Sequence, residues 1–148
     1  MELPPWLENA LERGCDFFFR HWPQPFPEAQ LLRECQIIAH RGAPAPPAVL
    51  ENTHAAFERA LSHPGVNGLE FDVRWTQDLQ PVVSHDADLF RLYGDSRCIV
   101  DFTLAELQYA FPEIPTLAAV IERYRARAHL MVELKEDGPI YLITFDLH

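Results

Sequence analysis

The stretch Gly68–Val73, which reads GLEFDV, decides how this chain is interpreted. Two acids, Glu70 and Asp72, interrupt its apolar run, and residues two apart on a β-strand project from the same face. Phe71 and Val73 then face the other way, toward covering helices. Two carboxylates directed into a strand-lined interior are costly unless they are paired or bind a metal. Because Glu-x-Asp alone is a weak signal, its meaning depends on the segments around it.

Three further apolar runs resemble this one in length and in their polar ends. They are Gln36–Ala39, which is followed by His40-Arg41-Gly42, then Pro81–Asp86, and His129–Lys135. Runs of four to seven residues that are rich in β-branched or aliphatic side chains are typical of buried parallel strands. The sequence therefore predicts four strands of this kind.

Helix-like segments with recognisable start signals lie between the predicted strands. Asn52 and Thr53 can cap a helix that runs through Leu61, and Thr103-Leu104-Ala105-Glu106 is a capping box. Thr116 opens a further helix over residues 117–128, after a longer loop at 87–102. Alternation of strands and helices predicts an α/β fold with a parallel sheet.

Polar residues gather where the predicted strands end. The carboxyl ends of parallel strands form one rim, where ligands bind and catalytic groups meet. Seven residues would converge there although they are far apart in sequence: His40, Arg41, Glu70, Asp72, His85, Glu133 and Lys135. A hard divalent cation with oxygen ligands is the natural partner of Glu70 and Asp72, and Glu133 supplies a third carboxylate.

The other rim residues each have a functional and a structural interpretation. His40 and His85 are candidates for general acid and base catalysis, or hydrogen-bonded structural residues. The planar fork of Arg41 suits phosphate oxygens, or it forms a salt bridge to one of the same carboxylates. Lys135 adds a second positive charge, or it balances Glu133. Gly42 would let the backbone turn closely past a ligand.

The net charge of the chain limits the kinds of molecule that it is expected to bind. Its 148 residues carry a net charge of -10, from 22 acidic and 12 basic side chains, and such a field repels nucleic acid and anionic membranes. Phosphate chemistry here would require a bound cation. Three separated cysteines, with no leader-like start and no apolar run that could span a bilayer, predict a reduced, cytoplasmic protein without a transmembrane segment. The absence of HxH, HExxH and GxGxxG opposes amidohydrolase, zincin and dinucleotide-binding functions.

The two ends of the sequence differ from its middle. Residues 1–35 predict an amphipathic helix over Pro5–Arg20 and a proline-rich linker over 21–27. Residues 136–148 form an atypical tail, in which Ile140–Phe145 could be a short fifth strand. Residues 36–135 are the predicted catalytic part.

The motifs of residues 36–135 occur in an order that resembles the glycerophosphodiester phosphodiesterase family. They are Ile38-Ala39-His40-Arg41-Gly42, Glu51-Asn52-Thr53, Leu69–Val73, Thr76-Gln77-Asp78 with Pro81–Asp86, Thr103–Leu107, Ile114–Leu117 and Glu133-Leu134-Lys135. No single one of these motifs is specific, but seven in the right order are.

The resemblance implies a fold, a reaction and a role for each rim residue. The family has a (β/α)8 TIM barrel and cleaves glycerophosphodiesters to glycerol 3-phosphate and an alcohol. By resemblance, Glu70, Asp72 and Glu133 would hold one Mg²⁺ or Ca²⁺ ion. His40 would accept a proton, His85 would donate one to the leaving alcohol, and Arg41, assisted by Lys135, would bind phosphate. Two alternatives stay open: a phospholipase D-like activity on lysophospholipids, and an inactive metal-binding fragment.

The length of the chain departs from the family pattern. A complete barrel needs about 200 to 250 residues, so this sequence predicts a partial barrel of about the first four βα units after an N-terminal helix, truncated after the fourth strand. An incomplete sheet leaves open edges and exposed apolar faces, which predicts self-association.

Overall fold

A computed structural model describes residues 17–18 and 27–135. Contacts between residues divide the chain into two units, Met1–Cys35 and Gln36–His148, and each is described here by itself. The predicted tail at 136–148, with its strand at Ile140–Phe145, lies outside the described residues.

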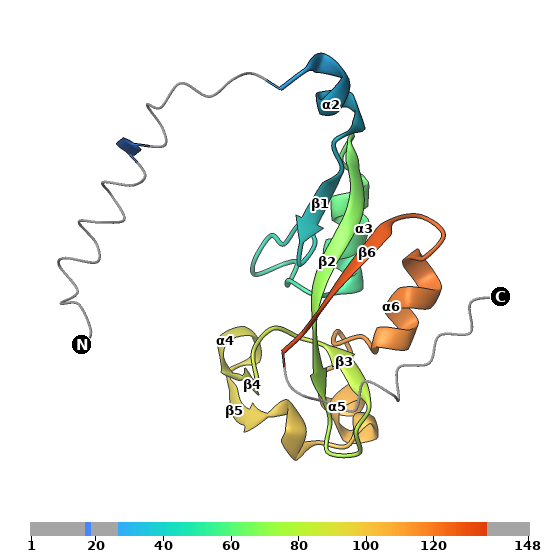
Figure 1. Cartoon of the computed structure of the whole chain (residues 1–148). Coiled ribbons are helices and arrows are strands. Elements are labelled where there is room, and N and C mark those ends of the chain that lie inside the picture. Colours follow the sequence, from blue (N-terminus) through green and yellow to red (C-terminus); the bar gives the residue numbers. More distant parts are fainter. Residues whose placement is uncertain (1–16, 19–26, 136–148) are drawn as a thin grey trace, which may run out of the picture. The chain divides into compact units, whose positions relative to one another are not determined.

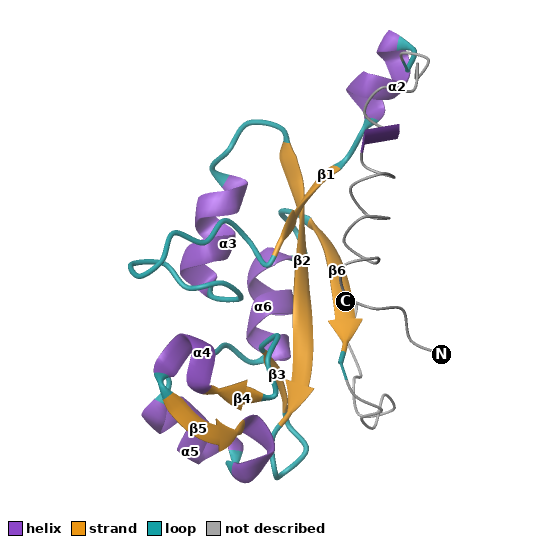
Figure 2. Ribbon diagram, turned by 90° about the vertical axis from the view of Figure 1, so that its left-hand side faces the viewer, coloured by secondary structure: helices purple, strands orange, loops and turns teal. Residues whose placement is uncertain are grey.

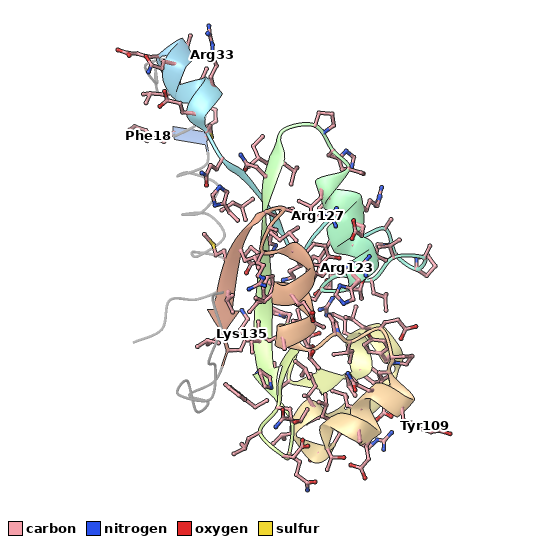
Figure 3. All side chains as sticks on the ribbon, turned by 90° about the vertical axis from the view of Figure 1, so that its right-hand side faces the viewer. Phe18, Arg33, Tyr109, Arg123, Arg127 and Lys135 are labelled. Atoms are coloured by element: carbon pink, nitrogen blue, oxygen red, sulfur yellow. The ribbon has the colours of Figure 1, made fainter. Side chains whose placement is uncertain are left out.

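In the first unit the described part is short and exposed. Phe17 and Phe18 are helical, and α2 spans Ala29–Glu34 without burying any residue. The exposed side chains of Phe18 and Arg33 are labelled in Figure 3. The sequence did not predict α2, and the rest of the predicted helix at 5–20 and most of the predicted linker at 21–27 lie outside the described residues.

The second unit is organised around one long central strand, β2 (Val66–Trp75). It pairs in parallel with β1 (Ile37–His40) and with β6 (His129–Leu134). Helices α3 (His54–Leu61) and α6 (Leu117–Tyr124) cover one face of this sheet, as Figures 1 and 2 show. The predicted α/β class with a parallel open sheet is confirmed.

The prediction that the run at Pro81–Asp86 forms a parallel strand was wrong. Strand β3 (Pro81–Val83) pairs with β2 in the antiparallel sense, with Val73 opposite Val83. Only residues 76–80 separate the two strands, and a parallel crossover needs a dozen or more residues. Within this turn Thr76 N–H donates to the Gln80 carbonyl over 3.1 Å. Three described strands, rather than four, therefore belong to βα-type units.

The predicted loop at 87–102 was also wrong, because this segment contains short elements. In chain order they are β4 (Asp88–Leu89), α4 (Phe90–Tyr93), β5 (Asp95–Cys98) and the 3-10 helix η1 (Ile99–Asp101), followed by α5 (Leu104–Ala110). They surround an apolar cluster made of Val82, Leu89, Ile99, Phe102, Leu107 and Ile114. Elements of two to four residues are too short to show a hydrophobic period, so burial within this cluster is what stabilises them.

The predicted helix starts are confirmed by their caps. Thr53 Oγ1 accepts a hydrogen bond from Ala56 N–H, and Thr116 Oγ1 accepts one from Ala119 N–H. Thr103 and Glu106 form the reciprocal capping box that starts α5. The last helix is shorter than predicted, because α6 ends at Tyr124 and a turn replaces its expected final residues.

The core under the covering helices fixes which way β2 faces. Phe57 of α3 packs against Phe71 of β2 and Tyr124 of α6, with both ring centroids 5.7 Å from its own. Phe71 and Val73 are fully buried in this cluster. Since strand side chains alternate, Glu70 and Asp72 must point to the opposite face, as the sequence predicted.

Gly42 is required by its contact with α3. Its φ is +82°, and a Cβ at this position would lie 2.7 Å from the backbone carbonyl carbon of Ala56. The close approach that the structure shows is to α3, and the expected approach to a ligand stays a prediction. We expect Gly42→Ala to lower the free energy of unfolding by about 2–3 kcal/mol, measured by urea denaturation, because it adds a backbone clash to a strained φ. Gly94→Ala is the matched control: Gly94 has φ +73° but open space around its Cβ position, so its loss should be about 1 kcal/mol. Equal losses for the two variants would contradict this assignment.

A salt-bridge cluster joins the two covering helices. Glu58 on α3 accepts hydrogen bonds from both terminal nitrogens of Arg127, at 3.0 and 2.9 Å, and from Arg123 Nε at 3.0 Å. Figure 3 labels Arg123 and Arg127 on and just after α6. Hydrogen bonds from Arg127 in particular lower the pKa of Glu58 from 4.5 to about 2.

The cluster should stabilise the fold only while Glu58 is ionised. The lowered pKa adds stability that is fully present above pH 4.5 and is lost as the pH falls toward 2. Because the Glu58 side chain is 36% exposed, solvent screening reduces the gain to about 0.5–1 kcal/mol. We expect Glu58→Gln to lose this amount at pH 7 and nothing near pH 2, measured by denaturation at both values. Glu122→Gln, at an exposed position on α6, is the control. If the stability of Glu58→Gln is still below that of the unaltered chain at low pH, the salt-bridge interpretation is wrong.

Candidate functional site

Three carboxylates meet where the carboxyl end of β6 lies beside the middle of β2. Asp72 and Glu133 are opposite one another in the parallel register of these strands, and Glu70 lies two residues before Asp72. One oxygen from each carboxylate lies within 4.8 Å of the others. Asp72 is fully buried, whereas the Glu133 side chain is 52% exposed. The structure therefore brings together the three acids that the sequence grouped.

The arrangement of these oxygens fits a divalent cation. Carboxylate oxygens are hard ligands, and one Ca²⁺ or Mg²⁺ ion binds its oxygen ligands about 2.0 to 2.6 Å away, which places ligands at most about 5 Å apart. Asp72 Oδ1 is buried and accepts no hydrogen bond from any described residue, although Lys135 Nζ lies 3.0 Å away. A buried anionic oxygen without a hydrogen bond is suited to direct ligation of a metal.

Two cations flank the central carboxylate. Lys135 Nζ lies 2.6 Å from Glu133 Oε1 as well as 3.0 Å from Asp72 Oδ1, and Arg41 Nε lies 3.2 Å from Asp72 Oδ2. Burial alone would raise the pKa of Asp72, but the hydrogen bond from Asn52 and the charges of Lys135 and Arg41 outweigh it and lower the pKa. Asp72 is therefore held as a carboxylate. Both structural alternatives given for Arg41 and Lys135 are present as ion pairs.

The two histidines have different surroundings. His40, at the end of β1, is 68% exposed, and its Nε2 lies 3.8 Å from Glu70 Oε2. His85 follows β3, and its Nδ1 lies 2.7 Å from Asp86 Oδ1. Arg74 donates from Nε and Nη2 to the His85 carbonyl over 2.9 and 2.8 Å, which fixes the backbone at this position. The structure thus brings His40 beside Glu70, while the contacts of His85 are with Asp86 and Arg74.

Four residues of the site were not assigned a role from the sequence: Glu51, Asn52, Asp86 and Arg91. Asn52 has φ +58°, a conformation that asparagine tolerates, and its Nδ2 donates to Asp72 Oδ2 over 3.0 Å. Glu51 Oε1 accepts from Arg41 Nη1 over 3.1 Å. The Glu51-Asn52-Thr53 motif was the signal that could have identified two of the four.

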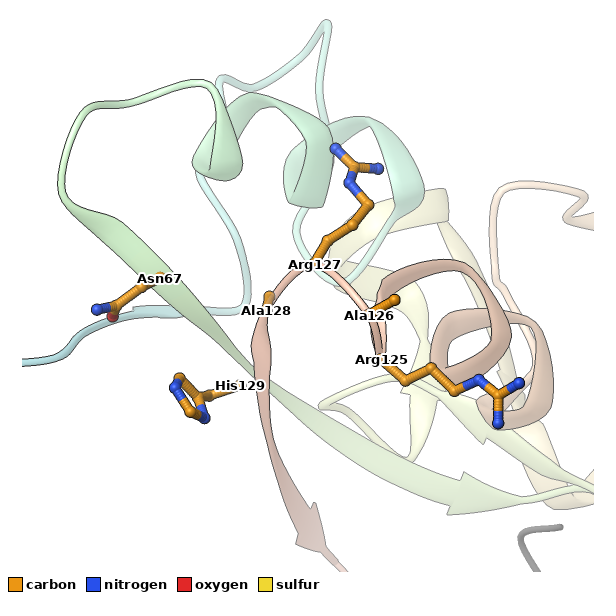
Figure 4. A pocket seen from close by; sticks show the side chains of 6 residues that line it. All are labelled: Asn67, Arg125, Ala126, Arg127, Ala128 and His129. Atoms are coloured by element: carbon orange, nitrogen blue, oxygen red, sulfur yellow. The ribbon is translucent and has the colours of Figure 1, made fainter. Parts of the chain in front are cut away.

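A separate cavity lies at the opposite ends of the strands. It has a volume of about 340 Å³ and is lined by Asn67, near the start of β2, and by Arg125–His129, which lead into β6 (Figure 4). Because the acids lie near the other ends of these strands, this cavity is separate from the acidic cluster. Among the described residues, no helix is long and apolar enough to cross a membrane.

Comparisons with known proteins identify the family of the chain. The model of the glycerophosphoryl diester phosphodiesterase family matches residues 40–139. The protein YhdW of Bacillus subtilis (strain 168) is 42% identical over 112 residues, which cover 67% of this chain and 44% of YhdW. Glycerophosphodiester phosphodiesterase 1 of Mus musculus is 33% identical over 138 residues, covering 80% of this chain and 40% of the mouse protein.

Solved structures give the same result for the fold. A glycerophosphodiester phosphodiesterase from Thermotoga maritima is 39% identical with a TM-score of 0.61, over 69% of this chain and 45% of that one. A phosphodiesterase from Oleispira antarctica, in complex with the product sn-glycerol-3-phosphate, is 35% identical with a TM-score of 0.56, over 68% and 44%. The chain thus spans under half the length of these relatives. With the family model matching well over half of its residues, the chain belongs to the glycerophosphoryl diester phosphodiesterase family.

Proposed function

We propose that the chain carries the catalytic rim of a metal-dependent phosphodiesterase that cleaves glycerophosphodiesters to glycerol 3-phosphate and an alcohol. The observation that carries this proposal is the approach of Glu70, Asp72 and Glu133 to within 4.8 Å of one another. It is supported by the similarity to a phosphodiesterase whose structure holds sn-glycerol-3-phosphate.

The three acids would hold one Mg²⁺ or Ca²⁺ ion. When bound, such an ion supplies charge neutralisation at a phosphate oxygen and lowers the pKa of a nucleophilic oxygen. It also reconciles an anionic substrate with a protein of net charge -10. Asp72 would be the central ligand, since it lies between Glu70 on its own strand and Glu133 on the neighbouring strand.

The cationic side chains would orient the phosphate. Arg41 and Lys135 lie within 3.2 Å of Asp72, so their donors are already at the rim where phosphate oxygens would approach the carboxylates. Arg41 retains a second partner in Glu51, which keeps its guanidinium in place. A planar guanidinium and an ammonium both bind phosphate oxygens through charge-assisted hydrogen bonds.

The histidines would move the protons. His40 would take a proton from the attacking oxygen, because its ring lies beside Glu70 and is open to solvent. His85 would give a proton to the departing alcohol, so that the leaving group departs as a neutral alcohol and not as an alkoxide. The nucleophile is water or a hydroxyl group of the substrate.

A second candidate function is the cleavage of lysophospholipids in the manner of a phospholipase D. It is favoured by a 70-residue match, 44% identical, to Lysophospholipase D GDPD1 of Rattus norvegicus. A third candidate, an inactive metal-binding fragment, is favoured by the short share of its relatives that this chain covers.

A cytoplasmic location and self-association through open sheet edges stay predictions, the latter motivated by the exposure of Met131 and Val132 on β6.

Removal of the metal tests the proposed function. We expect the chain to release choline from glycerophosphocholine in the presence of Mg²⁺ or Ca²⁺, to lose this activity in EDTA, and to regain it when metal is restored, because the three acids repel the anionic substrate without the ion. Release should be measured in parallel with lysophosphatidylcholine, and preference for that lipid would favour the second candidate.

Two further outcomes separate the remaining possibilities. A rise in melting temperature with Mg²⁺ or Ca²⁺, without hydrolysis of either substrate, would identify a metal-binding fragment. Hydrolysis that is unaffected by EDTA would refute the proposed metal dependence.

A further inference from the structure

We propose that Arg91 is a positioning residue, which joins the His85–Asp86 pair to the Arg41–Glu51 pair and so holds both at the rim. This inference rests on the proposed function for the role of His85, but the geometry on which it depends is independent of that function. Arg91 lies in α4, within the segment between β3 and α6 that packs around its own apolar cluster.

Arg91 bridges two carboxylates that come from different parts of the chain. Its Nε lies 2.6 Å from Asp86 Oδ2, while Nη2 and Nη1 lie 2.6 and 3.1 Å from the two oxygens of Glu51. Glu51 precedes Arg91 by 40 residues in the sequence. A guanidinium that contacts one carboxylate with two nitrogens and a second carboxylate with the third is oriented through all three of its nitrogens.

The bridge orients the imidazole of His85 through Asp86. A carboxylate only accepts hydrogen bonds, so the 2.7 Å contact requires the proton of a neutral His85 ring to be on Nδ1. Arg74 already holds the His85 carbonyl, which leaves the ring as the part that Asp86 must fix. Arg91 contacts the other oxygen of Asp86. The imidazole, the carboxylate and the guanidinium are therefore connected in a line, and each fixes the orientation of the next.

The same guanidinium continues the series to the metal-binding acids. Glu51 lies between Arg91 and Arg41, and Arg41 lies 3.2 Å from Asp72. Hydrogen bonds from Arg91 are the main cause of the lowered pKa of Glu51, which keeps this acid ionised between its two cations. Negative and positive groups therefore alternate from Asp86 through Arg91, Glu51 and Arg41 to Asp72.

The ion pairs of Arg91 differ from ordinary surface ion pairs, although Arg91 itself is exposed. The Arg91 side chain is 47% exposed, but its partners Glu51 and Asp86 are only 15% and 23% exposed. Loss of Arg91 would leave both largely buried carboxylates short of a partner, which is more disruptive than loss of a pair in open solvent. Asp86 would then be free to rotate away from His85.

The test compares Arg91→Met, which keeps an unbranched apolar stem but removes the charge and the donors, with Arg97→Met. Arg97 pairs with Asp95, both on strand β5, and among the described residues it forms no ion pair with a carboxylate of the rim. The first readout is a long-range ¹H–¹⁵N spectrum at a pH where the imidazoles are neutral, with the His85 signals assigned from their loss in His85→Gln. We expect a single Nδ1-protonated form of His85 in the unaltered chain and in Arg97→Met, and a mixture of both tautomers in Arg91→Met.

The second readout uses two substrates that differ in their leaving group. Glycerophosphocholine releases a poor leaving group that needs a proton, whereas the p-nitrophenyl ester of glycerol phosphate releases a stable anion that does not. We expect Arg91→Met to lower kcat about 10- to 100-fold on the choline ester, with KM little changed, and less than about 3-fold on the p-nitrophenyl ester. Arg91→Lys, which can reach only one carboxylate at a time, should fall between.

Each outcome is assigned in advance. An unchanged His85 spectrum in Arg91→Met, or an equal loss of rate on both esters, would overturn the inference. Where Arg91→Met is unfolded, Arg91→Lys replaces it, and an unchanged tautomer there together with an equal loss of rate on both esters has the same consequence. If His85→Gln shows no dependence on the leaving group, the proposed role of His85 fails, and the spectrum still decides whether Arg91 positions the ring.

Discussion

Asp72→Asn is expected to abolish the stabilisation of this protein by Mg²⁺ or Ca²⁺ and to lower metal-dependent hydrolysis by about 10³-fold or more. Asp72 is fully buried and is the member of the acidic cluster that is adjacent to both others. An amide has the same shape but is a neutral and weaker ligand for a hard cation. The variant also leaves Arg41 and Lys135 without their shared anion, although each keeps a second partner in Glu51 or Glu133.

The loss of fold stability should be smaller than the loss of function. Breaking a fully buried ion pair destabilises a protein by about 3–5 kcal/mol, but these two cations are partly exposed and keep other partners, so we expect about 1–2 kcal/mol. The measurement is the melting temperature as a function of added metal, beside the rate on glycerophosphocholine. Asp88→Asn is the matched control, since Asp88 is exposed and asparagine can replace its hydrogen bond to Phe90 N–H. A normal response of Asp72→Asn to metal would show that the acids do not bind the ion.

The part of the site that could be predicted from the sequence is the part fixed by local geometry. The two-residue period of a strand places Glu70 and Asp72 on one face wherever the strand lies, and Phe71 identifies the other face as the core. The contribution of Glu133 depends on the register between β2 and β6, a non-local property that the sequence indicated only through the place of Glu133 at the end of a predicted strand and the order of the family motifs. The helix caps Thr53 and Thr103 also depend only on neighbouring residues, and both predicted caps are confirmed.

What the sequence did not reveal depends on how distant segments pack. The composition of Pro81–Val83 suits a parallel strand as well as an antiparallel one. Only the short five-residue connection before it indicates the antiparallel direction. The short elements that follow are stabilised by a shared apolar cluster rather than by their own periodicity. The contact of Arg91 with Glu51 joins residues 40 positions apart through a long side chain, and no spacing rule anticipates it.

Variants of the two histidines are expected to differ in how they respond to the leaving group. His40→Ala should lower the rate by about 10²- to 10⁴-fold on both the choline and the p-nitrophenyl ester, because the attacking oxygen must lose its proton whichever group departs. His85→Ala should lower the rate by a similar factor on the choline ester but by less than about 10-fold on the p-nitrophenyl ester. His63→Ala, at an exposed position just after α3, is the control and should retain full activity.

Chemical rescue makes the same distinction in a second way. The His40 side chain is 68% exposed, so imidazole added to the buffer can occupy the space left by His40→Ala and accept the proton in its place. His85 is 31% exposed and its ring position is bounded by Asp86, so added imidazole should restore much less activity to His85→Ala. Rescue should therefore be strong for the proposed base and weak for the proposed acid. Only the general acid becomes dispensable when the departing group needs no proton. If His40→Ala, rather than His85→Ala, loses its defect on the p-nitrophenyl ester, the two proton-transfer roles are therefore exchanged.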